Sequence, residues 1–120
     1  MTKRVLYAED ELSNRMVMQL ALRDLDVRLD LAEDGNQALA LCEANDYDLI
    51  LLDQYMPGKN GDQVARALTE RGVRTPLVAI TSDDTWVSAL QGMGYADVFI
   101  KPLTGSGFLE RIRELLVLEG

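Results

Sequence analysis

A chain of 120 residues is long enough for one domain with a single core, and a composition of 48% hydrophobic and 27% charged residues is that of an ordinary globular protein. The formal net charge of −8 argues against general binding to nucleic acid or to an anionic membrane surface. No segment approaches the ~18 consecutive apolar residues of a membrane-spanning helix, so we expect no membrane insertion.

Cysteine and histidine usage bear on the compartment and the chemistry. The apolar stretch near the N-terminus, residues 5–8, is too short for a secretory signal, and the lone Cys42 cannot form an internal disulfide. Both observations favour a reducing, cytoplasmic location, with Cys42 facing the core. The absence of histidine excludes a Ser-His-Asp triad, a histidine-ligated zinc site and a phosphohistidine carrier. Any phosphoryl chemistry must therefore use carboxylates.

Short apolar runs alternate with longer helical patterns along the chain, which is typical of β/α repeats around a parallel sheet. In order, the predicted elements are strand 5–8, helix 12–25, strand 27–31, helix 35–44, strand 49–52, helix 61–71, strand 77–80, helix 85–93, strand 98–100 and helix 106–118. The strand at 27–31 alternates apolar and polar residues, as an edge strand does. We predict one doubly wound α/β domain over residues 1–120, without a linker or a second domain.

The first predicted helix carries two apolar stripes. One consists of Val17, Met18, Ala21, Leu22 and Leu25. The other, which we call the α1 stripe, consists of Leu12, Met16 and Leu20, spaced four residues apart. Either both stripes are buried, or the α1 stripe is a docking surface beside the acids that follow the first strand.

Charged side chains follow the carboxyl ends of three predicted strands, where open α/β sheets bind ligands. Glu9 and Asp10 follow the first strand, Asp53 the third and Lys101 the fifth. If the first and third strands are neighbours, the carboxylates converge, and each pair at ~4 Å costs roughly 4 kcal/mol at an effective dielectric constant near 20. Lys101 supplies only one positive charge. A hard divalent cation bound through oxygens, such as Mg²⁺, would complete the balance.

Asp53 has a second potential role as a nucleophile, since a carboxylate can attack phosphorus to give an aspartyl phosphate. Such a transfer needs mainly positioning and neutralisation of the phosphoryl oxygens. Mg²⁺ and Lys101 would each take one oxygen and the Thr81 hydroxyl a third, with help from the backbone N–H groups of Tyr55 and Ser82. Each acid alone is more commonly a helix cap or a turn residue. Their place at successive strand ends favours a site.

These residues resemble the signature of a response-regulator receiver domain of two-component signalling, over nearly the whole chain. The matching positions are Glu9-Asp10, Asp53, Met56-Pro57, Asn60-Gly61, Thr81 and Lys101-Pro102. The resemblance implies a flavodoxin-like fold with strand order 2-1-3-4-5, as in chemotaxis regulators. The run Ala8-Glu9-Asp10-Glu11, followed by Asn14-Arg15, is similar to receivers attached to hybrid histidine kinases.

The resemblance also implies roles for the acids. Asp53 looks like the phosphoacceptor, which receives its phosphoryl group from a histidine on a sensor kinase or a phosphotransfer protein. Asp10, Asp53 and the Tyr55 carbonyl look like direct ligands of Mg²⁺ (or Mn²⁺), and Glu9 like the acid that holds metal-bound water. Such a domain is a signalling switch, not a turnover enzyme, and catalyses only its own phosphorylation and dephosphorylation. It can also self-associate or bind a downstream effector.

Other matching positions concern the readout of the signal. Thr81 and Lys101 resemble the switch hydroxyl and the phosphate-contacting lysine. Val98 stands where receivers often have an aromatic that rotates with this hydroxyl, and Phe99 is expected on the opposite face of the strand, which leaves the route of propagation open. Ser82 replaces a common alanine and predicts slower access to the phosphoryl group.

The family register of the first helix places the stripe that begins at Val17 inward. It leaves Leu12, Met16 and Leu20 exposed, as a docking surface for a helical partner. Trp86, near the start of the predicted fourth helix, is interpreted as a partly buried packing residue that can report changes on that face.

Two other functions remain as alternatives. One is a receiver-like scaffold that binds partners without phosphorylation, although such a scaffold would not need the acids, Thr81 and Lys101. The other is a small phosphatase that passes through an aspartyl phosphate. Phosphatases of this kind typically carry a second acid two residues after the nucleophile, where this chain has Tyr55, and they usually have a cap domain.

Overall fold

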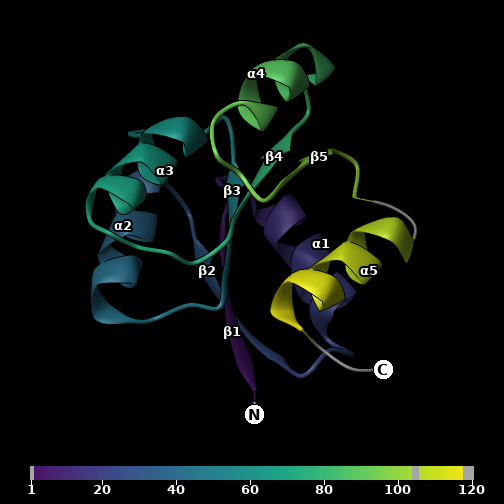
Figure 1. Ribbon diagram of the computed structural model, residues 1–120. Coiled ribbons are helices and arrows are strands. Elements are labelled where there is room, and N and C mark those ends of the chain that lie inside the picture. The colour runs from purple at the N-terminus through teal and green to yellow at the C-terminus, as the bar shows by residue number, and fades with distance from the viewer. Residues whose placement is uncertain (1, 104–105, 118–120) are drawn as a thin grey trace.

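The computed structural model describes residues 2–103 and 106–117, which form a parallel sheet covered by helices on both faces (Figure 1). The strands are β1 (Lys3–Ala8), β2 (Val27–Ala32), β3 (Leu49–Asp53), β4 (Leu77–Thr81) and β5 (Asp97–Ile100). The helices are α1 (Leu12–Leu22), α2 (Gly35–Ala44), α3 (Gly61–Glu70), α4 (Val87–Gln91) and α5 (Ser106–Leu116), with a 3₁₀ turn, η1, at Asp84–Trp86. Among these helices, none has the length and apolarity needed to cross a bilayer.

The sheet has the order β2-β1-β3-β4-β5, and every neighbouring pair is parallel. This order confirms the predicted doubly wound fold and the edge position of β2. Every residue of β3, with the sequence LILLD, is buried, as expected for a central strand with both faces covered. Because the strands are parallel, the carboxyl ends of β1, β3, β4 and β5 lie at one edge of the sheet.

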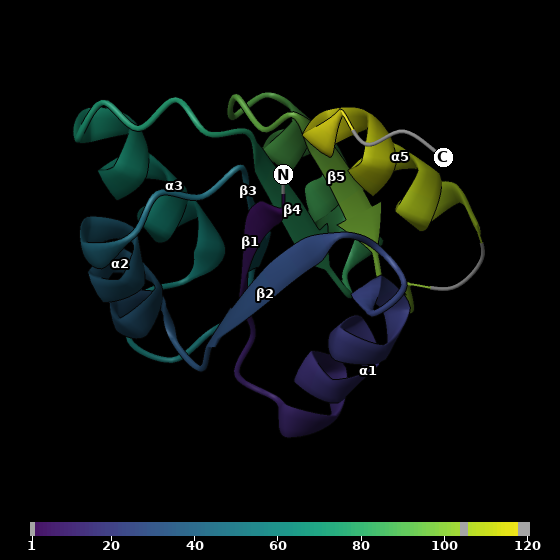
Figure 2. The same cartoon turned by 90° about the horizontal axis from the view of Figure 1, so that it is seen from below.

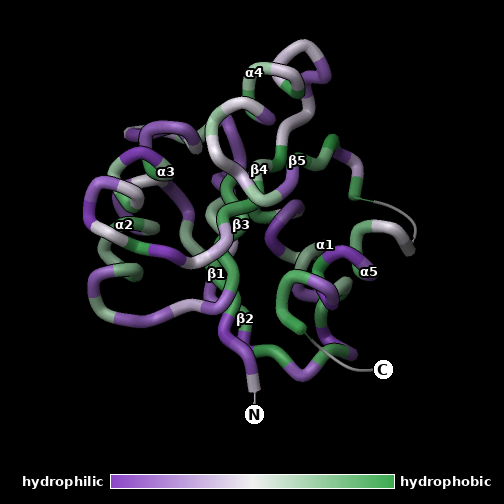
Figure 3. The backbone as a smooth tube through the Cα atoms, in the orientation of Figure 1, coloured by the Kyte–Doolittle hydropathy of each residue, from purple (hydrophilic) through white to green (hydrophobic). Residues whose placement is uncertain are grey.

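Two hydrophobic clusters lie on opposite faces of the sheet. Successive residues of a strand point to opposite faces, so Val5 and Leu51 belong to one cluster and Leu6 and Leu52 to the other. Helices α1 and α5 cover the first cluster, and α2 and α3 cover the second (Figure 2). Hydrophobic residues are concentrated along the central strands (Figure 3). Cys42 is half-buried against the second cluster, in agreement with its predicted packing role.

Two helices differ most from their predicted bounds. Helix α1 ends at Leu22, not at residue 25, because the Leu25 N–H bonds to the Leu22 carbonyl (3.0 Å) in a tighter turn that still buries Leu25. The helix predicted at 85–93 is divided into η1 and the five-residue α4. Gly94, with φ of 88°, reverses the chain soon afterwards. The other bounds agree to within two residues, although the predicted end at Leu118 lies outside the described residues.

The predicted exposure of the α1 stripe is confirmed. The exposed fractions are 64% for Leu12, 53% for Met16 and 62% for Leu20. The stripe is therefore an apolar surface on one face of α1.

The prediction that Val17 faces inward is wrong, because its side chain is 53% exposed. The buried residues of α1 are Arg15, Met18 and Leu22, which follow one another at helical spacing. The buried face is thus centred on Met18. Val17 lies about 100° around the helix from Met18 and so falls at the edge of this face.

Candidate functional site

Three carboxylates meet at the carboxyl edge of the sheet. Glu9 and Asp10 follow β1, and Asp53 ends β3, whose Leu52 pairs with Ala8 of β1. Each acid offers an oxygen that lies within 4.8 Å of the oxygens of the other two. Glu9 and Asp53 are buried and Asp10 is exposed. The structure thus brings together the three acids that the sequence placed at strand ends.

Lys101, directly after β5, reaches across the sheet edge to these acids. Its Nζ donates a hydrogen bond to Asp53 Oδ2 (3.0 Å) and another to Glu9 Oε1. Its backbone N–H donates to the Thr81 carbonyl (2.8 Å), which fixes the residue beside the end of β4. The Lys101-Pro102 peptide bond is cis. One ammonium group therefore faces two buried carboxylates.

Burial and the neighbouring charges give these acids different pKa values. Burial is the main cause that raises the pKa of Asp53 to about 7; the neighbouring Glu9 adds to the rise and Lys101 opposes it. Burial acts to raise the pKa of Glu9 as well, but hydrogen bonds with Asp53, Lys101 and Asp10 outweigh it and lower that pKa to about 2. Burial and Glu9 raise the pKa of Asp10. Asp53 is therefore the acid whose charge changes near neutral pH.

Thr81 ends β4 next to Asp53, since Asp53 pairs with Ile80 across β3 and β4. Its side chain is fully buried, and its Oγ1 accepts a hydrogen bond from the Asp83 N–H (3.1 Å). Ser82, the next residue, is exposed. The Thr81 hydroxyl is thus engaged in the loop between β4 and η1.

Tyr55 lies in the loop between β3 and α3, with its side chain 47% exposed. Its ring and that of Trp86 form a T-shaped pair, with ring centroids 6.4 Å apart and an interplanar angle of 81°. Trp86 is one of the exposed large hydrophobic side chains, with an exposed fraction of 37%, so the prediction of a partly buried packing residue is not confirmed. This contact connects the loop after Asp53 to η1.

The two sides of β5 differ as predicted. Phe99 packs edge-to-face on Phe108 of α5, with centroids 5.0 Å apart, within the cluster that α1 and α5 cover. Val98 is half-buried and belongs to neither cluster. With valine at this position, β5 has no aromatic ring on the face opposite Phe99.

Sequence reasoning missed Arg15 and Tyr7. Arg15 is only 9% exposed, its Nη1 donates to the Glu9 carbonyl (2.8 Å), and its Nη2 lies 3.6 Å from Glu33 Oε1. The Tyr7 hydroxyl donates to Glu9 Oε1 (3.2 Å), and burial raises the tyrosine pKa. The burial of Arg15 could have been predicted from the sequence, because Arg15 lies three residues before Met18 and so on the same helix face.

Comparison with known proteins decides the family. Residues 5–113 match the model of the response regulator receiver domain. The chain belongs to this family. The receiver domain is 32% identical over 115 residues to the transcriptional regulatory protein ResD of Bacillus subtilis, an alignment that covers 94% of this chain and 48% of ResD. The chain spans about half the length of the bacterial regulators it matches.

Solved receiver structures have the same fold. The response regulator TrrA of Thermotoga maritima, in complex with Mg²⁺–BeF, has a TM-score of 0.87 and 26% identity, over 95% of this chain and 99% of that chain. The receiver domain of the sensor histidine kinase PA1611 of Pseudomonas aeruginosa, with a magnesium ion in its active-site cleft, has a TM-score of 0.86 and 27% identity, over 98% and 99% of the two chains. Acceptance of a phosphoryl group in signalling is therefore the function of this receiver domain.

Proposed function

We propose that Asp53 accepts a phosphoryl group from a phosphohistidine of a sensor kinase or phosphotransfer protein, in a Mg²⁺-dependent reaction that switches a single receiver domain formed by residues 1–120. The observation that supports this proposal most strongly is the meeting of Glu9, Asp10 and Lys101 around Asp53. A carboxylate oxygen of Asp53 attacks phosphorus, a P–O bond forms, and the P–N bond to the partner's imidazole breaks. The imidazole leaves with the electron pair of that bond.

The donor set fits a hard divalent cation. Its three carboxylates lie within 4.8 Å of one another, two of them buried and one open to solvent, and oxygen-only ligands suit Mg²⁺ and Mn²⁺. Asp10, Asp53 and the Tyr55 carbonyl would hold the ion, and Glu9 would hold a water of its shell. When bound, the ion would neutralise part of the negative charge on the acids and on the phosphoryl oxygens.

Lys101 and Thr81 would contact the phosphoryl group after transfer and so respond to it. The Lys101 ammonium already contacts Asp53 and would contact a phosphoryl oxygen after transfer. The Thr81 hydroxyl donates to the Asp83 carbonyl (3.4 Å) and must turn from it to donate to another phosphoryl oxygen. Phosphorylation would therefore rearrange the loop after β4 and shift the balance between two conformations. Trp86, in η1 after this loop, would report the shift.

Intact-mass spectrometry tests this function and separates it from the alternatives. We expect the wild type, incubated with Mg²⁺ and a small phosphodonor, to gain one phosphoryl group, and a chelator to prevent the gain. Release of phosphate without an adduct would instead indicate a phosphatase. A protein that neither gains the group nor releases phosphate would be a phosphorylation-independent scaffold.

Mg²⁺ is expected to bind more tightly at pH 8 than at pH 6. The pKa of Asp53 is about 7, and a protonated carboxyl must lose its proton before it can bind the metal. One competing proton with this pKa predicts a ~10-fold rise in apparent affinity between the two pH values. Mg²⁺ titrations followed by Trp86 fluorescence at constant ionic strength measure the effect, and an affinity independent of pH would contradict it.

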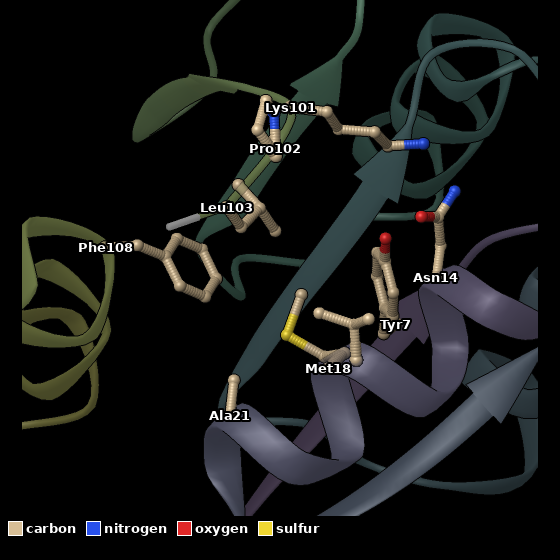
Figure 4. A pocket seen from close by; sticks show the side chains of 9 residues that line it. Tyr7, Asn14, Met18, Ala21, Lys101, Pro102, Leu103 and Phe108 are labelled. Atoms are coloured by element: carbon tan, nitrogen blue, oxygen red, sulfur yellow. The ribbon is translucent and has the colours of Figure 1, made fainter. Parts of the chain in front are cut away.

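The α1 stripe is the proposed docking surface for the helix that carries the partner's histidine. On another face of α1, an apolar pocket of about 110 Å³ opens between α1 and α5, lined in part by Met18 and Phe108 (Figure 4). Lys101 and Asn14 lie at one end of this pocket (Figure 4). The apolar lining of the pocket thus extends to the lysine that contacts Asp53. A helix lying on α1 would bring its histidine to the acids.

A Met16→Glu, Leu20→Glu double variant is expected to lose phosphotransfer from its partner by tenfold or more, because two carboxylates would be buried at the interface. Phosphorylation by a small donor should be unchanged, since neither residue belongs to the acid cluster. Met93→Glu, at a side chain 47% exposed away from α1, is the matched control. Normal partner transfer in a folded double variant would rule out this surface.

A further inference from the structure

The connection between β2 and α2 supplies no oxygen to the acid cluster found among the described residues, yet it contacts both loops that do. We call residues 32–36, the last residue of β2 and the start of α2, the β2–α2 corner. Its Asp34 side chain caps α2 by accepting from the Gln37 N–H (2.7 Å), which makes the corner a well-defined turn. Two separate contacts join it to the metal-binding loops.

The first contact holds the backbone on both sides of Glu9, including the peptide group that joins it to Asp10. The Glu9 N–H donates to the Ala32 carbonyl at the end of β2 (2.9 Å), and the Glu9 carbonyl accepts from Arg15 Nη1 (2.8 Å). Arg15 Nη2 lies 3.6 Å from Glu33 Oε1 in the corner. The charge of an arginine that is only 9% exposed is costly to bury unless it is paired. Here it is paired with the backbone from which the Asp10 side chain projects.

The second contact holds the loop after Asp53. A Cβ atom on Gly35 would lie 2.7 Å from Lys59 Cβ and 2.9 Å from the Lys59 carbonyl carbon, and closer still to its carbonyl oxygen. Gly58 has φ of 80°, and a Cβ there would lie 2.9 Å from Asn36 Nδ2. The loop that contains Tyr55 therefore rests directly on the first turn of α2, at a distance that only glycine allows.

We propose that the β2–α2 corner positions the Mg²⁺ site, with Arg15 as the positioning residue for Asp10 and Gly35 as the positioning residue for the Tyr55 carbonyl. This inference rests on the proposed Mg²⁺-dependent function. Metal ligands act together only when they are held to within ~0.5 Å of a productive geometry. The corner contacts both ligand-bearing loops and so holds them against the start of one helix, α2. Residues without a metal-binding atom thereby set the relative position of those that have one.

Gly35→Ala tests the second contact. The added methyl group would push Lys59 and its loop away, and we expect Mg²⁺ affinity, measured by calorimetric titration at pH 8, to fall ~10-fold or more, in the range of outer-shell mutations at metal sites. Hydrogen exchange at the Gly61 amide, bonded to the Gln54 carbonyl (3.0 Å), should be faster before metal is added. Gly107→Ala is the matched control, because a Cβ at Gly107 meets nothing within 4 Å.

Arg15→Met and Arg15→Lys test the first contact. The methionine variant is expected to lose ~10-fold in Mg²⁺ affinity. The lysine variant should recover part of this loss, because its ammonium group can still donate to the Glu9 carbonyl. Arg23→Met, on a side chain 69% exposed at the end of the same helix, should bind as the wild type does. Thermal unfolding is recorded for every variant, because a merely structural role would lower the melting temperature and leave the Mg²⁺ affinity of the folded protein unchanged.

The outcomes separate this inference from the proposed function. If folded Gly35→Ala and Arg15→Met bind Mg²⁺ as tightly as the wild type, the corner has no positioning role, while the proposed function stands. If the wild type itself binds no Mg²⁺, the proposed function fails and this inference fails with it.

Discussion

The Asp53→Asn protein is expected to gain no phosphoryl group and, at pH 8 in a chelating buffer, to unfold at a higher temperature than the wild type. The first effect follows because an amide oxygen is too weak a nucleophile to replace the carboxylate that attacks phosphorus. The second follows because Asp53 is only 4% exposed and lies among Glu9 and Asp10, so its ionisation costs the folded state free energy. Asparagine keeps the shape without the charge.

The direction of the pH effect is fixed by the raised pKa of Asp53. In the unfolded chain the carboxyl has the ordinary value of 3.8, whereas in the folded protein burial raises it to about 7. The folded state therefore holds a proton that the unfolded state has released, and the stability of the wild type falls as pH rises through this interval. The stability advantage of Asp53→Asn should grow from pH 4 and level off above pH 7.5 at roughly 4 kcal/mol, the free energy that corresponds to a pKa of about 7 in place of 3.8.

Melting curves of both proteins at several pH values, with and without Mg²⁺, measure this effect. Mg²⁺ should stabilise the wild type more than the variant, because the variant lacks one carboxylate ligand. Mass spectrometry of the same samples gives the phosphorylation result. An adduct that persists in Asp53→Asn would show that another residue is the acceptor. A variant less stable than the wild type at pH 8 would contradict the electrostatic account.

Lys101→Met is expected to lower the rate of phosphorylation by a small donor ~100-fold, the scale of removing one charged group from a phosphoryl or oxyanion site. It should also destabilise the metal-free protein at pH 8 by ~2–3 kcal/mol, because two buried carboxylates lose their common counter-ion. Burial alone would lower the pKa of Lys101, but hydrogen bonds with Glu9 and Asp53 raise it. The ammonium group is therefore fully charged at pH 8, and its stabilising effect is fully present there.

Mg²⁺ should restore much of the lost stability, since the cation would neutralise the same two acids. The measurements are a phosphorylation time course and chemical denaturation with and without Mg²⁺. Lys3→Met, at the opposite end of the sheet, is the matched control for the loss of one positive charge. A Lys101→Met protein that is phosphorylated at the wild-type rate would remove this residue from the proposed mechanism.

Local sequence patterns predicted most of the fold because the physics that they report is local. A short apolar run such as residues 49–52, flanked on both sides by a turn and a helical pattern, predicts a strand that is buried on both faces. The boundaries that differed depend on single contacts: the Leu25 N–H bonds to the Leu22 carbonyl after α1, and the Gly92 N–H bonds to the Ala89 carbonyl where α4 ends. The strand order came from resemblance, since periodicity alone does not state which strands are neighbours.

By itself, the sequence determined the class of chemistry. The chain has no histidine and carries acids and one lysine at strand ends. These residues predict a metal site made of oxygen ligands and phosphoryl transfer to a carboxylate. Only the tertiary structure decided how the acids differ and what holds them. The pKa of Asp53 depends on burial beside Glu9, and the Glu9 carbonyl is held by Arg15.

The reason is that these properties depend on distances between residues far apart in the chain. Arg15 meets Glu33 and Gly35 meets Lys59 only once the sheet has brought their loops to one edge. The exposure of Val17 likewise depends on which face of α1 the sheet accepts. A pattern within one helix or strand carries no record of such contacts, because burial and charge at a site are sums over neighbours from the whole fold.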